Sequence, residues 1–379
     1  MEPGIYMGLL PVISRRDFLK LTGAGILVLA ARVSGGAAAA RLVPVLWLLG
    51  QGCAGCTTAM LEATSMDPVG VLVGARIYSV SFRVVANPLF SIVSGEEYLD
   101  VLRAAAEGGS ARLPGGEVVN FSEGYVLVVE GSLPVCRDPV TCMGLPEALY
   151  CYLGIEEGEP VPCTEWFRRL LARASALMAA GTCASYGGVR AAEAPSYSSS
   201  GLPVTGAVGV FPDPVRGRPG LLDMLAEGRD FLSRGGVAVA VPGCPANGEA
   251  IIRTLASLVL AVEGLAEPPS LDAYHRPVYI YAATTHEQCP RLSEYEAGIF
   301  RTAPGEPTAG CLFRVGCKGK RSNCPWNMVG WVNGIGGPTR TGGVCTGCTM
   351  PGFPDAYEPF WRRSGGRRGG GRGRGARSG

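Results

Sequence analysis

The stretch Val43-Pro-Val-Leu-Trp-Leu-Leu-Gly-Gln-Gly-Cys-Ala-Gly-Cys56 predicts a buried strand that leads directly into a pair of cysteines. The apolar run from Val43 to Leu49 has the length of a strand and stops at a glycine, and the residues from Thr57 to Thr64 have helical character. Cys53 and Cys56 are therefore expected on the loop between the carboxyl end of a strand and the start of a helix. Doubly wound sheets place their ligands on such loops, and backbone N–H groups at a helix start favour an anionic group.

The same arrangement recurs along the chain. Ala176–Ala180 leads into a glycine-containing loop with Cys183, and Val237–Val241 leads into another with Cys244. Further segments alternate with these runs: a strand-like pattern at Tyr125–Glu130 and helix-like patterns at Gly220–Arg234 and Gly248–Glu263. This alternation predicts an α/β fold, a doubly wound parallel sheet with helices on both faces.

The carboxyl ends of parallel strands meet at one edge of a sheet. We therefore expect Cys53, Cys56, Cys183 and Cys244 to lie close together. Four thiolates from three strand ends form a binding site for a 4Fe-4S cluster, and the glycines beside them permit the close backbone approach that a bulky cluster requires.

The second cysteine-rich stretch runs from His286 to Cys348. It contains six cysteines and one histidine but little continuous apolar periodicity, so a packed core is not expected there. Thiolate-bound metal would supply the missing folding free energy. Only Cys345-Thr-Gly-Cys348 has the short spacing of structural zinc sites. Iron–sulfur clusters accept wider spacings and an occasional histidine, so the pattern favours clusters, with zinc and disulfides as alternatives.

These motifs resemble the cluster-binding region of the small subunit of nickel–iron hydrogenases. The resemblance is carried by His286-x-x-Cys289-Pro290, Cys311-x5-Cys317-Lys-Gly, Asn323-Cys324-Pro325 and Cys345-x-Gly-Cys348, and it extends over roughly residues 42 to 360. It implies an electron-transfer subunit of a hydrogenase that oxidises H2 reversibly. The nickel–iron centre that splits hydrogen would lie in a partner large subunit, and no catalytic residue is expected in this chain.

The resemblance implies two 4Fe-4S clusters and one 3Fe-4S cluster in a line. The implied ligands are Cys53, Cys56, Cys183 and Cys244 for the proximal 4Fe-4S cluster, Cys324, Cys345 and Cys348 for the medial 3Fe-4S cluster, and His286, Cys289, Cys311 and Cys317 for the distal 4Fe-4S cluster. Pro338 stands where the resemblance places a fourth medial ligand. Gly55 and Gly188 stand where oxygen-tolerant relatives add cysteines, which implies an ordinary proximal cluster and an oxygen-sensitive enzyme.

The termini differ in composition from the body of the chain. Ser14-Arg15-Arg16-Asp-Phe-Leu-Lys20 precedes a short apolar run and small residues, which predicts a twin-arginine signal peptide over residues 1–40. This route carries folded cargo, so clusters would be inserted before export. Residues 361–379 contain seven arginines among glycines and serines and no acid, which predicts a disordered tail, with contact to RNA or anionic lipid as the alternative.

The expected organisation is a flavodoxin-like domain over residues 41–270 and a smaller, irregular iron–sulfur domain over residues 271–360. The protein is expected at the periplasmic or outer face of the cell membrane, attached through partners. The implied partners are the large subunit, in a heterodimer or a dimer of heterodimers, and an acceptor such as a membrane cytochrome b or quinone. The net charge of +2 predicts no nucleic-acid partner for the body.

Four cysteines match no motif: Cys136, Cys142, Cys151 and Cys163. Their even number in an exported protein predicts one or two disulfides, and a further cluster or zinc site is the alternative. Two other functions remain open for the whole chain. One is a quinone-reductase iron–sulfur subunit, which would leave the second cysteine-rich stretch unused, and the other is a secreted zinc- or disulfide-stabilised binding protein.

Overall fold

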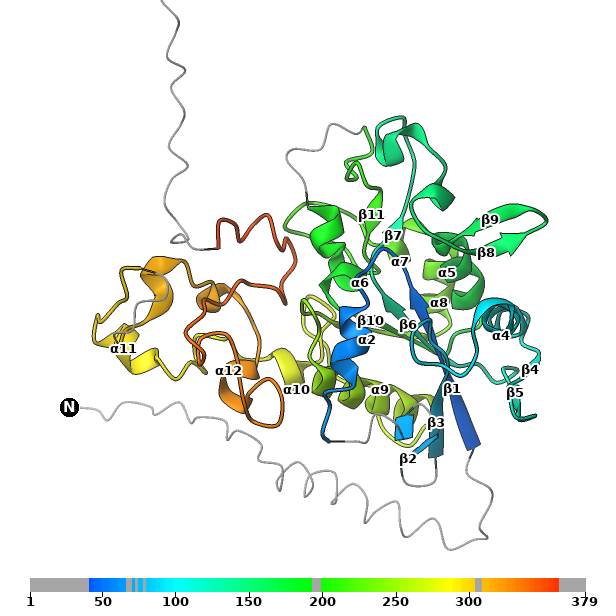
Figure 1. Ribbon diagram of the computed structural model, residues 1–379, viewed down its shortest axis with the longest axis horizontal. Coiled ribbons are helices and arrows are strands. Elements are labelled where there is room, and N and C mark those ends of the chain that lie inside the picture. The colour runs from blue at the N-terminus through cyan, green and yellow to red at the C-terminus, as the bar shows by residue number, and fades with distance from the viewer. Residues whose placement is uncertain are drawn as a thin grey trace, which may run out of the picture. The chain divides into compact units, whose positions relative to one another are not determined.

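Figure 1 shows the computed structural model, which describes residues 41–65, 70–71, 74–77, 80–192, 199–303 and 309–360. The predicted twin-arginine signal and the Arg/Gly-rich tail lie outside these residues. Among the described residues, no helix is both long enough and apolar enough to cross a membrane.

A six-stranded sheet organises the first part of the described chain. Its strands, in spatial order, are β12 (Val237–Val241), β10 (Ala176–Ala180), β6 (Val126–Glu130), β1 (Arg41–Leu49), β3 (Val80–Ala86) and β2 (Ala75–Ile77). Five of them form a central parallel sheet, and β2 pairs antiparallel with β3 at one edge. The five strands lie in the order second, first, third, fourth and fifth along the chain, as in flavodoxin-like sheets. The predicted α/β fold with a parallel sheet is confirmed.

Helices cover both faces of this sheet (Figure 1). Leu46 and Leu48 of β1 belong to one buried cluster, which includes side chains of α4 (Gly95–Glu107), α5 (Cys163–Leu171) and α8 (Ala226–Ser233). Val45 and Trp47, the alternate residues of the same strand, belong to a second cluster with α2 (Gly55–Met60) and α9 (Gly248–Val262). Because successive strand residues point to opposite faces, a continuous apolar run supplies two cores at once.

The other described elements are short. The remaining helices are α6 (Thr182–Tyr186), α7 (Leu221–Met224), α10 (Val278–Tyr281), α11 (Leu292–Glu296) and α12 (Trp326–Val329). The remaining strands pair antiparallel in twos: β4 (Ser110–Arg112) with β5 (Val118–Asn120), β7 (Leu133–Pro134) with β11 (Ala207–Val208), and β8 (Tyr152–Glu156) with β9 (Glu159–Pro162).

The helix expected over Gly220–Arg234 is in fact two helices, α7 and α8, separated at Leu225, whose backbone is extended. The break lets α8 fold back onto α7. Gly228 of α8 lies directly against the backbone of Leu222, too close for any side chain, so tertiary packing overrides the local helical preference here.

The cysteine-rich segment is irregular. Between residues 282 and 360, the described residues contain only two α-helices, α11 and α12, of five and four residues. The segment packs on the sheet region, because Trp326 is buried in the same cluster as α9 and Tyr281. The described residues from Leu42 onward belong to one compact unit, and a domain boundary at residue 270 stays a prediction.

Candidate functional site

The register of the sheet aligns the carboxyl ends of its strands. Leu49 pairs with Glu130, Glu130 with Ala180, and Ala180 with Val241. The loops that follow β1, β10 and β12 therefore leave the sheet at one edge. Cys53 and Cys244 lie in these loops, whereas Cys56 lies in the first turn of α2 rather than in the expected loop, and Cys183 lies in α6.

The structure brings these four cysteines together. Burial raises the pKa of Cys244 to about 11, and the neighbouring Cys183 and Cys53 thiols add to the rise. The pKa of Cys56 is raised well above its usual value by burial, then by Glu130, Cys183 and Cys53. Neutral thiols crowded in this way ionise only when a cation compensates their charge, and the irons of a cluster supply that compensation.

Glu130 anchors the first turn of α2, which presents Cys56. Its buried carboxylate accepts hydrogen bonds from the backbone N–H groups of Cys56 (2.8 Å) and Thr57 (3.1 Å), from the Thr57 hydroxyl, and from Nε1 of Trp47 (3.0 Å). The side chain is 2% exposed, so all four donors are satisfied away from water. The position of the cysteine pair is therefore set by a residue on the neighbouring strand.

Three more cysteines surround a second cavity. Cys324, Cys345 and Cys348 line it, and Pro338 lines it as well. Burial raises the pKa of all three cysteines, most strongly that of Cys324. The proline brings no donor atom, so this cavity offers three thiols for ligation.

Arg276 holds the backbone around this cavity. Its guanidinium is buried and donates to Asp272 Oδ2 (2.8 Å), to Asn323 Oδ1 (3.2 Å) and to the carbonyl of Thr349 (3.2 Å). Two of these partners directly neighbour medial cysteines in the sequence. A buried arginine with a carboxylate partner therefore connects the sheet region to the two loops that carry those cysteines.

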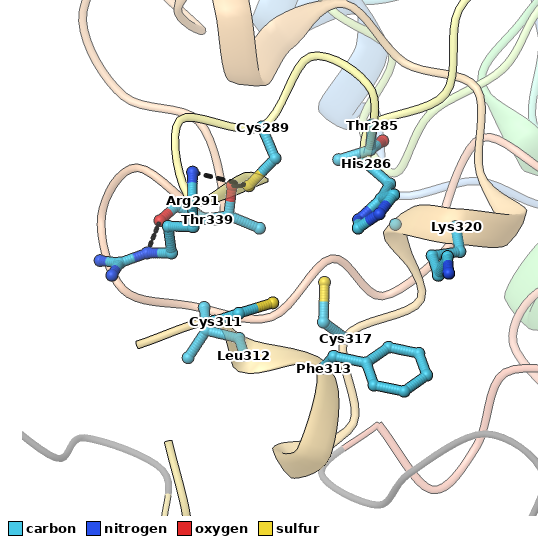
Figure 2. Close-up of a pocket in the computed structure, with 11 residues that line it drawn as sticks. Thr285, His286, Cys289, Arg291, Cys311, Leu312, Phe313, Cys317, Lys320 and Thr339 are labelled. Carbon is cyan, nitrogen blue, oxygen red and sulfur yellow. Dashed lines mark hydrogen bonds between the residues drawn. The ribbon is translucent and has the colours of Figure 1, made fainter. Parts of the chain in front are cut away.

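Four residues predicted as a set line a third cavity: His286, Cys289, Cys311 and Cys317 (Figure 2). Burial raises the pKa of Cys317 to about 11. Burial and the Lys320 ammonium lower the pKa of His286, which keeps its imidazole neutral. The neutral imidazole is the form that binds metal.

The three groups of cysteines are neighbours. The Thr182 hydroxyl, next to Cys183, donates to the carbonyl of Cys348. On the other side, the backbone N–H of Lys318 donates to the carbonyl of Cys345 (2.8 Å). The cysteines of the predicted medial set therefore lie between those of the predicted proximal set and those of the predicted distal set. Among the described residues, no three His, Cys, Asp or Glu side chains converge on a point that could hold a single metal ion, and the distal and medial cysteines instead surround cavities.

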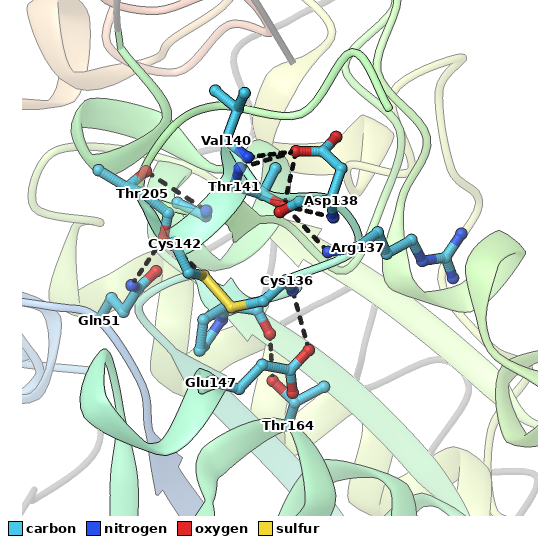
Figure 3. The surroundings of a disulfide bond; sticks show 12 residues. Gln51, Cys136, Arg137, Asp138, Val140, Thr141, Cys142, Glu147, Thr164 and Thr205 are labelled. Atoms are coloured by element: carbon cyan, nitrogen blue, oxygen red, sulfur yellow. Dashed lines mark hydrogen bonds between the residues drawn. A yellow bond between two sulfur atoms is a disulfide. The ribbon is translucent and has the colours of Figure 1, made fainter. Parts of the chain in front are cut away.

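The four unassigned cysteines form two disulfides, Cys136–Cys142 and Cys151–Cys163, which confirms the prediction of one or two disulfides. The first lies beside the loop before Cys53 (Figure 3). Gln51 Nε2 donates to the carbonyl of Thr205 (3.3 Å), the same carbonyl that lies 3.9 Å from Cys142 Sγ.

Comparison with known proteins identifies the family. The family model for the C-terminal region of NiFe/NiFeSe hydrogenase small subunits matches residues 281–361, and that of the NADH ubiquinone oxidoreductase 20 Kd subunit matches residues 53–258. The periplasmic [NiFeSe] hydrogenase small subunit of Desulfomicrobium baculatum is 30% identical over 367 residues, covering 92% of this chain and 98% of the relative. The Hydrogenase-2 small chain of Escherichia coli K12 is 29% identical over 352 residues, covering 90% and 77%.

Among solved structures, an actinobacterial-type NiFe-hydrogenase from Ralstonia eutropha H16 superposes with a TM-score of 0.69 at 32% identity, covering 88% of this chain and 86% of that one. The fold and the cysteine sites define an iron–sulfur electron-transfer subunit. The chain belongs to the nickel–iron hydrogenase small subunit family, whose NiFe site lies in the large subunit. The match of residues 53–258 shows that the sheet region is shared with the quinone-reductase subunit, whereas the match of residues 281–361 is to the hydrogenase model.

Sequence reasoning missed Glu130 and Arg276, which hold the backbone beside the cysteines, and it missed Thr285 and Thr339, whose hydroxyls lie near cysteine sulfurs. Only Glu130 could have been noticed in the sequence, because a carboxylate at the end of an otherwise apolar strand is rare unless it has buried partners. The others lie in irregular loops, where the sequence carries no periodicity.

Proposed function

We propose that this chain conducts electrons from H2 oxidation in a partner large subunit, through three iron–sulfur clusters, to an acceptor such as a membrane cytochrome b or quinone. When bound, the clusters accept and release single electrons. The observation that carries the proposal is the grouping of the predicted ligands. His286 and its three cysteines line one cavity, the three medial cysteines line the next, and the proximal cysteines meet at the sheet edge.

This grouping supports three proposed ligand sets. Cys53, Cys56, Cys183 and Cys244 would hold the proximal 4Fe-4S cluster, Cys324, Cys345 and Cys348 the medial 3Fe-4S cluster, and His286, Cys289, Cys311 and Cys317 the distal 4Fe-4S cluster. An additional cysteine near the proximal site is disfavoured by the backbone. Gly188 has a φ of +55°, and an added Cβ would lie 2.8 Å from Cys183 Sγ. This supports an ordinary proximal cluster and an oxygen-sensitive enzyme.

Iron and labile-sulfide analysis of the anaerobically purified heterodimer tests the proposal. After subtracting the iron of the large subunit, we expect about eleven iron atoms per small subunit, the sum of two 4Fe-4S clusters and one 3Fe-4S cluster. Stoichiometric zinc in place of iron would instead support a zinc-stabilised binding protein and would refute the electron-transfer role.

The proposal includes export through the twin-arginine route to the periplasmic or outer face of the cell membrane, with membrane attachment through partners. The periplasmic relatives support export. Arg15→Lys combined with Arg16→Lys is expected to leave the precursor in the cytoplasm with its clusters bound. Normal export of the double variant would show that another signal is used.

A further inference from the structure

Two threonine hydroxyls lie against the sulfurs of the proposed clusters. Both side chains are buried, Thr285 with 2% and Thr339 with 1% of its surface exposed. A buried hydroxyl without a partner is destabilising, whereas valine fills the same volume without that cost. The hydrogen-bond partners of these two hydroxyls therefore indicate the function of the hydroxyls.

Thr285 lies between the medial and distal sites. Its side chain lines both cavities, and its Oγ1 lies 3.8 Å from Cys345 Sγ of the medial set. Among the described residues, the hydrogen-bond partner of this hydroxyl is Cys345 of the predicted medial set.

Thr339 occupies the matching position at the distal site. It lines the distal cavity, and its Oγ1 lies 3.1 Å from Cys289 Sγ (Figure 2). Its backbone is fixed independently of this contact. The N–H donates to Asn327 Oδ1 (3.1 Å), and the carbonyl accepts from Arg291 Nε (3.0 Å). The hydroxyl is thus not needed to hold the loop in place.

The direction of these hydrogen bonds follows from ligation. A free thiol can donate its proton to a hydroxyl oxygen. A thiolate bound to iron has no proton, so the hydroxyl must donate to the sulfur. Donation to a cluster sulfur stabilises the more negative, reduced cluster and therefore raises its reduction potential.

We propose that Thr285 and Thr339 are positioning residues that separately raise the reduction potentials of the medial and distal clusters by donating hydrogen bonds to their thiolate sulfurs. This inference rests on the proposed function, because it requires the clusters to be present. Each of the two clusters would then have its own hydrogen-bond donor, so that the two reduction potentials could be set separately although the two sites are neighbours.

An anaerobic redox titration followed by electron paramagnetic resonance tests the inference in the heterodimer. Thr285→Val is expected to shift the midpoint potential of the medial cluster to more negative values and to leave the distal cluster unchanged. Thr339→Val is expected to do the reverse. Thr285→Ser and Thr339→Ser retain the hydroxyl and should restore the potentials of the unsubstituted protein.

Thr349→Val is the matched control. Thr349 is also buried and also lines the medial cavity, but its hydroxyl donates to the carbonyl of Asn323 (2.8 Å) rather than to a sulfur. Its removal should leave the medial potential unchanged. Unshifted potentials in both valine variants, or an equal shift in the control, would overturn the inference.

Two further outcomes are distinguishable. If Thr285→Val fails to assemble its cluster, Thr285→Ala removes the same hydroxyl with a smaller, unbranched side chain, and the midpoint potential of its medial cluster gives the answer. If the unsubstituted protein shows no cluster signals at all, the proposed function itself fails, independently of the threonines.

Discussion

The sheet region and the cysteine-rich segment are stabilised in different ways. In the sheet region, two extensive apolar cores lie on either side of the strands, and large side chains such as Trp47 and Trp166 are fully buried. In the segment from residue 282 to 360, the separate apolar clusters are small. One consists of Leu312, Val315 and Val344, and the other of Met350, Phe353 and Tyr357.

Both small clusters pack against a proposed ligand. Cys317 contacts the first and Cys348 the second. Each small apolar cluster of the segment therefore lies beside a proposed ligand, and neither is extensive. The comparison predicts that burial of apolar surface stabilises the sheet region, whereas the proposed ligation would supply much of the stability of the segment.

Removal of iron should produce the largest difference between the two regions. We expect a chelator under anaerobic conditions to abolish nearly all amide hydrogen-exchange protection in residues 282–360, because structural metal ligation contributes on the order of 10 kcal/mol in metal-dependent folds. Strands β1, β6, β10 and β12 should remain protected. If both regions kept their hydrogen-exchange protection after iron removal, the proposed difference in how the two regions are stabilised would be wrong.

Glu130→Ala should destabilise the sheet region strongly. The variant leaves the Trp47 Nε1, two backbone N–H groups and the Thr57 hydroxyl without their acceptor, at a cost of about 3–5 kcal/mol in the free energy of unfolding. Glu130→Gln keeps one acceptor oxygen and should lose less. Denaturant unfolding followed by tryptophan fluorescence measures the change.

The control for this experiment is Glu96→Ala. Glu96 forms an exposed ion pair with Arg103, its side chain is 67% exposed, and its loss should cost less than about 1 kcal/mol. Equal losses for the two alanine variants would mean that the strand-end carboxylate contributes no more than a surface charge.

Loss of a disulfide should have an intermediate effect confined to the sheet region. Cys151→Ala with Cys163→Ala opens a loop between residues 12 positions apart, which should cost about 2–3 kcal/mol in unfolding free energy. The iron content should not change. Loss of iron from this double variant would show that the disulfide supports the clusters rather than the sheet alone.

The parts of the fold that could be predicted are those with a short-range signal. Strands β10 and β12 were predicted with their observed bounds, because a short apolar run ending at a glycine-containing loop is a local pattern. Their parallel register then explains why Cys183 and Cys244 share an edge. The helix break at Leu225 was not predictable, because it depends on close packing of Gly228 against α7.

The candidate site shows the same division. The placement of Cys53, Cys56, Cys183 and Cys244 after three strands predicted that they lie together, and the family resemblance implied the other two ligand sets. The pairing of the four disulfide cysteines required the structure, since four cysteines allow three pairings. Arg276, Thr285 and Thr339 could not be found from the sequence. Each acts on a residue far along the chain, and only the folded backbone brings the partners together.

Of these variants, Pro338→Cys should have the smallest effect on stability, but it should clearly change the electron paramagnetic resonance spectrum. Pro338 lines the medial cavity with the three cysteines, and its carbonyl accepts from the Gly343 N–H (2.9 Å), a contact that cysteine can retain. The introduced thiol should allow a fourth iron to bind, provided that the backbone tolerates losing the fixed φ of the proline ring.

The 3Fe-4S signal expected from the oxidised, unsubstituted protein by electron paramagnetic resonance should then disappear. If ligation stabilises the segment, the additional bond should raise hydrogen-exchange protection around Cys345, by no more than about 1 kcal/mol, because the other three ligands already order the loop. Pro338→Ala removes the ring without adding a ligand and separates the two effects. An unsubstituted protein with only diamagnetic oxidised clusters would contradict the medial assignment, and a signal that persists in the cysteine variant would show that residue 338 does not face the vacant corner.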